Sequence, residues 1–406
     1  MQRRRRGIVV ASALLVVTAA LWTPGPAAAV PVKMPAAGPA DSLDPLQAAV
    51  DEQVRHLDLR PLEEILAGLD DDVRERLPAR SVRDVIVDPQ GGLRLHPAEL
   101  LRELTRFLLA EVLLQSRLLG QLIVLAVLCA LLHNAAGSFS PAATEFGFLV
   151  AYMVIIFVAL QSFSAAAEVG RGVLADMSAF MLALLPLLST MLAAVGAVSS
   201  AALFHPLLLT VVTLVASLIE QVVFPLLFFA AVLGVVGRVA AGFPVSRIAD
   251  LLRQAATTAL GLFLTLFLGV MVIRGAIAPV ADGIALRTTK FLAGSFIPVI
   301  GGMMADAMEV VLGGSLLIKN AVGAFGMATL LVLLAFPLMK IFALVIIYRV
   351  ATAVVQPISD PRLVDALGAM AQTLTLLMAA VAAAALMFFV VITVVVGIGN
   401  WAALVR

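Results

Sequence analysis

The sequence is poor in the residues and motifs on which most enzymes and secreted scaffolds depend. It contains a single cysteine, Cys129, which excludes an internal disulfide and a cysteine metal cluster. Only 13% of its 406 residues are charged, against about a quarter in ordinary soluble domains, and the net charge of +1 gives no basic footprint for nucleic acid. The ATPase motif Gly-x-x-x-x-Gly-Lys-Ser/Thr is missing, as are the hydrolase motifs His-Glu-x-x-His and Gly-x-Ser-x-Gly. We therefore expect no enzymatic activity and no cofactor, and we assign no catalytic or metal-binding residue.

Apolar residues, by contrast, are in large excess. They make up 62% of the chain, whereas about half is usual for a soluble domain. A protein interior alone cannot absorb so much apolar surface, and long runs of this kind are typical of membrane spans. The sequence therefore predicts an all-α, polytopic transmembrane helical bundle in the cell membrane. Cys129 lies in one of the apolar runs, and we expect it to be a buried, unreactive thiol.

Residues 1–29 have the layout of a signal peptide. Arginines from Arg3 to Arg6 precede a short apolar stretch, residues 7–21, which is shorter than a membrane span. Ala27 and Ala29 then supply the small residues that favour cleavage after Ala29. An uncleaved signal anchor is the alternative. In both cases the segment that follows begins outside the cytoplasm.

Residues 30–116 are predicted to form an extracytoplasmic, mainly helical segment. Its last helix is expected to begin near Pro97, because proline suits the first turn of a helix. The apolar stripe of this helix consists of Leu100, Leu101, Leu104, Leu108 and Val112. Such a helix could lie on the membrane surface, pack on a partner or simply close the segment.

The membrane region begins with a predicted helix pair, residues 117–166, and then shows an internal repeat. A shift of 112 residues brings Pro186 onto Pro298 and the tripeptide Phe-Pro-Leu at 224–226 onto the one at 336–338. After a loop that is three residues longer in the second half, further pairs match, namely Arg247 with Arg362 and Asp250 with Asp365. We predict two parallel repeats, 167–273 and 279–396, because many transporter folds are built from internal repeats. A C-terminal tail, 397–406, follows.

Prolines divide the repeats, and the positive-inside rule orients them. Helix breaks are predicted at Pro186, Pro225, Pro298 and Pro337. The apolar runs that flank each Phe-Pro-Leu are short for a span, so they are expected to be tilted helices or a re-entrant pair. The arginine-bearing loops 237–253 and 349–371 are predicted to share the cytoplasmic side.

Charged and polar groups at membrane depth are the candidate functional residues, because such groups usually face protein or water. They are Glu220, Asp282, Arg287, Lys290, Asp306, Glu309, Lys319, Asn320 and Lys340. One interpretation is a polar pathway, and the alternative is pairing between helices. For Lys319 we expect pairing with Asp306 or Glu309, across a break at Gly313 and Gly314 that would fold the chain back.

Several motifs resemble one family. They are Ala281-Asp282-Gly283-Ile284, Arg287-Thr288-Thr289-Lys290-Phe291, Phe296-Ile297-Pro298-Val299, Ser315-Leu316-Leu317-Ile318-Lys319-Asn320, Phe204-His205-Pro206-Leu207, Phe224-Pro225-Leu226 and Gly397-Ile398-Gly399-Asn400. The order of these motifs along the chain agrees with that of the family, and from about residue 118 to the end the chain resembles stage III sporulation protein AE. Before that point only the layout agrees, a signal peptide and a short soluble region.

The resemblance implies a setting that composition does not reveal. Members of this family act in the mother-cell membrane that surrounds the forespore, as parts of a secretion-like channel complex needed for endospore development. The expected partners are other stage III sporulation proteins, including a cytoplasmic ATPase-like subunit, and the lipid bilayer. Nucleic acid is not expected, and a homo-oligomer is left open. The chain is then either a conduit or transporter-like core, or a structural hub that holds subunits and transports nothing; an intramembrane enzyme is a distant third.

Overall fold

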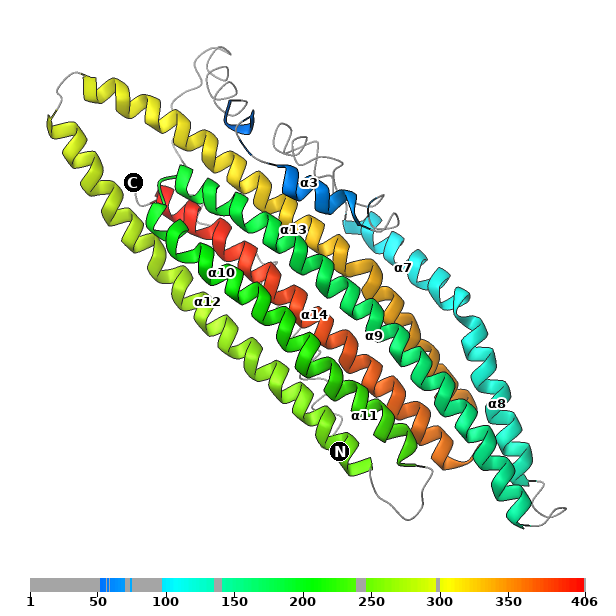
Figure 1. Cartoon of the computed structure of the whole chain (residues 1–406). Helices are drawn as coiled ribbons and strands as arrows, with labels where there is room; N and C mark the ends of the chain where they lie inside the picture. The colour runs from blue at the N-terminus through cyan, green and yellow to red at the C-terminus, as the bar shows by residue number, and fades with distance from the viewer. Residues whose placement is uncertain are drawn as a thin grey trace. The chain divides into compact units, whose positions relative to one another are not determined.

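A computed structural model describes residues 52–55, 57, 59–69, 74, 97–134, 141–238, 246–296 and 300–404, with few side chains between 276 and 309. These residues belong to one packing unit, Gln47–Arg406, and their regular elements are helical (Figure 1). The elements are α3 (Arg60–Ala67), α7 (Pro97–Leu114), α8 (Ser116–Asn134), α9 (Pro141–Ala194), α10 (Val198–Leu218), the π-helical turn η3 (Ile219–Val223), α11 (Phe224–Val236), α12 (Ser246–Phe296), α13 (Ile300–Val355) and α14 (Pro361–Leu404). The predicted signal peptide lies outside the described residues.

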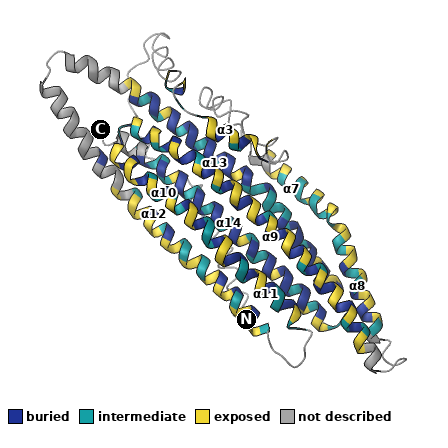
Figure 2. Cartoon of the chain, viewed as in Figure 1, coloured by how far each residue is buried: buried dark blue, intermediate teal, exposed yellow. Residues whose placement is uncertain are grey.

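Helix α14 is the centre of the packing. It contacts α9, α11, α12 and α13, and Figure 2 shows that its residues are mostly buried or half-buried. Alanines and bulkier side chains such as Leu377, Phe388 and Ile392 share its buried faces. Small residues let helices approach one another closely where no water drives them together. The core of the molecule therefore lies around its last helix.

The outer faces of the long helices are apolar. Large hydrophobic side chains such as Phe157 on α9 and Leu262 on α12 are exposed. Among the described residues, five helices are long and apolar enough to cross a membrane, or six when the bent pair Leu101–Leu114 and Ser116–Leu132 counts as one span. Exposed apolar surface on this scale needs lipid around it. The predicted multi-pass helical class is thereby confirmed, and Cys129 is buried as expected.

The prolines do not divide the helices as predicted. Pro186 lies inside α9 and Pro337 inside α13, and both helices continue past them. Pro225 follows the π-helical turn, whose extra residue accommodates the missing N–H and the bulk of the ring. Pro298 lies outside the described residues. The prediction of a re-entrant pair is wrong, because the runs that flank each Phe-Pro-Leu join into one long helical segment.

The helix that begins at Pro97 packs on the chain's own α13. The rings of Phe107 and Phe336 meet edge to face, with centroids 5.2 Å apart. Of the predicted stripe, Leu104 and Leu108 are half-buried, whereas Leu101 is 64% exposed. Helix α7 thus lies along a membrane-spanning helix instead of closing a separate small domain.

Candidate functional site

Lys319 is the most deeply buried of the described charged side chains of α13. It is 0% exposed, and its Nζ donates hydrogen bonds to the carbonyl oxygen of Val396 at 2.8 Å and to Asn400 Oδ1 at 3.4 Å, both on α14. A backbone carbonyl and an amide oxygen therefore offset part of the cost of burying the ammonium group.

The predicted pairing of Lys319 with acidic residues of its own helix is wrong. Helix α13 runs without interruption through Gly313 and Gly314, so the chain does not fold back there. Ten helical residues separate Glu309 from Lys319, which is about 15 Å along the axis and beyond the reach of a lysine side chain. The side chains of Asp306 and Glu309 are outside the described residues. The glycines behave as ordinary helical residues because packing against α9 and α14 holds the helix together.

A glycine on α13 brings α14 within reach of Lys319. Gly323 lies one turn beyond Lys319, and a Cβ atom placed on it would lie closer than 3.0 Å to Cγ2 of Val396. Real Cβ contacts essentially never become that short. The Val396 side chain therefore packs directly against the α13 backbone at Gly323, and the Val396 carbonyl lies beside the ammonium group.

Asp282 forms a second buried polar link, between α12 and α10. Its carboxylate is 0% exposed and accepts hydrogen bonds from the backbone N–H of Ser200, at 3.3 Å, and from the Ser200 hydroxyl group. Ser200 is the third residue of α10, where the N–H groups have no partner within the helix and the dipole is positive. Asp282 thus caps a helix from outside that helix, which sequence spacing alone could not indicate.

Arg253 forms a third link that the sequence did not predict. It is 5% exposed; its Nε donates to Thr373 Oγ1 at 3.1 Å and its Nη1 to Asp250 Oδ1 at 2.8 Å. Its Nη2 packs against Gly234, where a Cβ would collide with it. In the sequence Arg253 reads as one more basic residue of the loop 237–253, yet it joins α11, α12 and α14.

The other candidate residues do not converge on these groups. Glu220 is exposed on η3, and Lys340 is half-buried without a described hydrogen bond. The Asn320 Oδ1 atom is buried and has no hydrogen-bond partner among the described residues. The side chains of Arg287 and Lys290 are outside the described residues.

Two of the three links, those of Arg253 and Lys319, are far apart along α14. Thr373 and Val396 are separated by about 35 Å on α14, at about 1.5 Å per helical residue. No group of three or more metal-ligating side chains occurs among the described residues. The Arg253 and Lys319 links therefore connect helices to one another at separate levels.

These observations define the class of the protein. It is a polytopic helical membrane protein whose described buried charges are engaged by neighbouring helices.

The chain belongs to the stage III sporulation protein AE family, because the sequence model of that family matches residues 81–399. The stage III sporulation protein AE of Bacillus subtilis (strain 168) is 35% identical to it over 317 residues, which cover 78% of this chain and 79% of that protein. No solved structure matches the chain. The family match predicted from the motifs is confirmed, and it begins earlier than expected, within the segment before the first span.

Proposed function

We propose that this protein is the structural membrane hub of the complex between mother cell and forespore that stage III sporulation proteins build. It would lie in the mother-cell membrane and hold the other subunits, among them the cytoplasmic ATPase-like one. Family membership and the five candidate spans support this role.

The observation that carries the proposal is the state of Lys319. A charge used for transport has to meet water or a substrate, whereas a charge used for assembly is satisfied by protein. Lys319 is completely buried and bonded to α14, and Asp282 and Arg253 are likewise bonded to neighbouring helices. This pattern favours a rigid scaffold over a polar pathway.

A conduit is the second candidate, and one observation favours it. The oxygen atoms Asn320 Oδ1 and Thr329 Oγ1 on α13 are buried without a hydrogen-bond partner among the described residues. An unpaired buried polar atom costs about 1–3 kcal/mol, which a bound water would offset. Water molecules bound at these two oxygen atoms would form part of a polar pathway along α13.

The internal repeat belongs to the same proposal. Helices α12 and α14 begin at Ser246 and Pro361, so Asp250 and Asp365 are each the fifth residue of their helix. Each of these helices follows a long apolar helical segment that contains Phe-Pro-Leu. The arrangement supports two parallel repeats, which would give the hub two comparable surfaces for partners.

Replacing Lys319 with methionine separates the two functions. Methionine has nearly the length of lysine and no charge, so it removes the ammonium group with little change in volume. It also removes the two hydrogen bonds to α14, and a hydrogen bond to a charged group contributes about 1.5–3 kcal/mol. The measurements are membrane abundance, co-purification of the other stage III proteins and spore titre, in the native host with its own copy replaced. Lys340→Met is the matched control, because Lys340 lies on the same helix without a described hydrogen bond.

A hub predicts that Lys340→Met behaves as the wild type does, and that Lys319→Met loses spore formation only in proportion to any loss of membrane abundance and co-purification. Normal abundance and co-purification of Lys319→Met combined with lost spore formation would contradict the hub and favour the conduit. If the tagged protein recovers none of the other stage III proteins, the proposed membership in the complex itself is wrong.

A further inference from the structure

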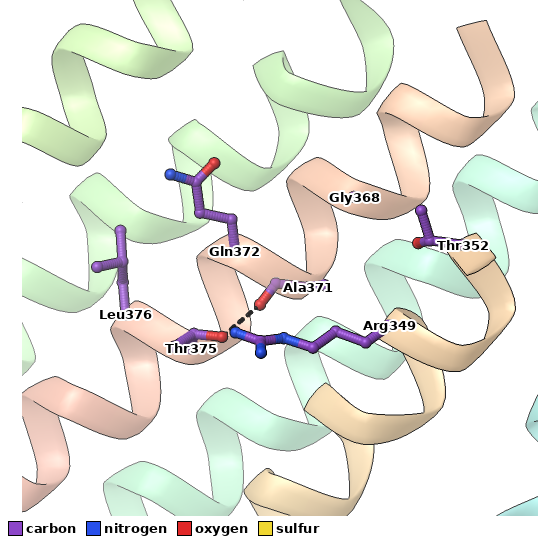
Figure 3. Close-up of a pocket in the computed structure, with 7 residues that line it drawn as sticks. All are labelled: Arg349, Thr352, Gly368, Ala371, Gln372, Thr375 and Leu376. Carbon is purple, nitrogen blue, oxygen red and sulfur yellow. Dashed lines mark hydrogen bonds between the residues drawn. The ribbon is translucent and has the colours of Figure 1, made fainter. Parts of the chain in front are cut away.

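A hollow lies on the surface of the bundle between α13 and α14, and its lining combines polar and apolar residues. It has a volume of about 280 Å3 and is lined by Arg349 and Thr352 of α13 and by residues of α14 that include Gly368, Gln372, Thr375 and Leu376. Figure 3 shows the Arg349 side chain reaching from its helix toward the α14 side of the hollow. Neither helix covers the opening, so this hollow faces whatever surrounds the bundle.

The chemistry of the hollow suits an anion with several oxygen atoms. The hydroxyl groups of Thr352 and Thr375 already donate to the carbonyls of Tyr348 and Ala371, at 2.6 and 2.7 Å. The exposed Arg349 makes no hydrogen bond or ion pair with the described residues. Its guanidinium group carries five donors in a planar fork, which matches carboxylate and phosphate oxygens, and the Gln372 amide adds two more.

The surface beyond the hollow is apolar. Phe342 and Leu338 precede Arg349 by seven and eleven residues, so they lie on the same face of α13, about 10 and 16 Å along its axis. Both are partly buried hydrophobic side chains, and Leu376 forms the corresponding wall on α14. One half of the hydrocarbon core of a bilayer is about 15 Å thick. The seam therefore has the length of an acyl chain in one leaflet.

The hollow also lies near the end of its helices, where a headgroup is found. Arg349 is six residues before the end of α13 at Val355, and Gly368 is seven residues after the start of α14. Both distances correspond to about 10 Å. A cationic donor at this depth, beside an apolar seam, has the polarity of an amphiphile and not that of a soluble ion.

We infer that the hollow between α13 and α14 binds a glycerophospholipid, with its phosphate on Arg349 and Gln372 and an acyl chain along the seam. The site is independent of whether the protein acts as a hub or a conduit. It would fix one lipid on the two helices that carry the core of the bundle.

The test uses the purified full chain in detergent, titrated with phosphatidylglycerol, with bound lipid counted by native mass spectrometry. The expected result for Arg349→Gln is binding that is at least about tenfold weaker, equivalent to about 1.4 kcal/mol or more, because the charge-assisted hydrogen bonds to the phosphate are lost. Arg274→Gln, at an exposed arginine of α12, is the matched control and should bind as the wild type does.

A second variant fills the hollow while Arg349 stays in place. A Cβ on Gly368 would meet only Thr352 Cγ2, at 3.9 Å, so Gly368→Ala fits and Gly368→Leu extends into the hollow. We expect wild-type binding for the alanine variant and clearly weaker binding for the leucine variant, both with an unchanged gel-filtration profile.

Two competitors test which part of the lipid is bound: diacylglycerol has the acyl chains without the phosphate, and inorganic phosphate has the anion without the chains. Neither should compete with phosphatidylglycerol at equal concentration. Equal competition by diacylglycerol would remove the role of the phosphate. Equal binding of inorganic phosphate would make the hollow a site for a soluble anion. Unchanged lipid binding by both Arg349→Gln and Gly368→Leu would overturn the proposal.

Discussion

Replacing Gly323 with alanine tests the close crossing of α13 and α14 most directly. The added methyl group would lie closer than 3.0 Å to Cγ2 of Val396, whereas carbon atoms in contact prefer about 3.5–4.0 Å. Val396 is β-branched and has one strongly preferred rotamer in a helix, so it cannot turn aside. The two helices must separate, and the 2.8 Å hydrogen bond from Lys319 to the Val396 carbonyl lengthens or breaks.

The size of the effect follows from opposing contributions. Overpacking a core by one methyl group costs about 1–3 kcal/mol, and loss of a charge-assisted hydrogen bond costs about 1.5–3 kcal/mol. Alanine regains up to about 1 kcal/mol of helix propensity over glycine. We expect Gly323→Ala to lower the free energy of unfolding by about 2–4 kcal/mol, measured by titration of the detergent-solubilised protein with a denaturing detergent and followed by circular dichroism.

The control is Gly269→Ala on α12, where an added Cβ meets nothing within 4 Å. This variant should be as stable as the wild type or up to about 1 kcal/mol more stable. Truncating Val396 to alanine in the Gly323→Ala background removes the collision, so the double variant should recover part of the loss. If Gly323→Ala is as stable as Gly269→Ala, the close approach and the argument built on it are wrong.

Three further predictions concern the other helix-to-helix links. Asp282→Ala should destabilise the protein by about 1–3 kcal/mol in the same detergent titration, because it strands the donors at the start of α10; an unchanged midpoint would argue against the cap. Gly234→Ala should destabilise less than Gly323→Ala, since its Cβ meets the end of the flexible Arg253 side chain; a larger loss would show that Arg253 is fixed. Of the predicted loops 237–253 and 349–371, residues 237–245 and 356–360 connect helices in the structure, and the rest belongs to α12, α13 and α14. Single cysteines in these two connections should react with an impermeant thiol reagent from the same side of the membrane; labelling from opposite sides would refute the parallel arrangement.

The hydropathy of the sequence was sufficient to predict the fold class and the approximate positions of the spans. The class of the fold and the approximate spans follow from long apolar runs, because every backbone group in lipid must be satisfied within a helix. The order of short motifs identified the family. The length of the helices was not predicted. Pro186, Pro337 and the Gly313-Gly314 pair were expected to interrupt helices, but α9 and α13 continue past them because neighbouring helices pack against them.

The partners of the buried charges were harder to predict. Lys319 was assigned to acids in its own helix, but its partners are about eighty residues later in the chain, and one of them is a backbone carbonyl. Every residue has a backbone carbonyl, so the sequence does not indicate which carbonyl accepts a hydrogen bond from a buried lysine. Arg253 was grouped with loop arginines because burial depends on the packing of three helices, which no local pattern encodes.

The position of α14 in the bundle has a consequence for biosynthesis. It leaves the ribosome after α9, α11, α12 and α13, yet all four of these helices pack against it. Until its final turns are inserted, Lys319 stays in the membrane without Val396 and Asn400, and Arg253 without Thr373. The nascent protein therefore passes through a state in which Lys319 and Arg253 lack the partners that α14 supplies, and a chain interrupted before α14 is complete leaves both charges without them.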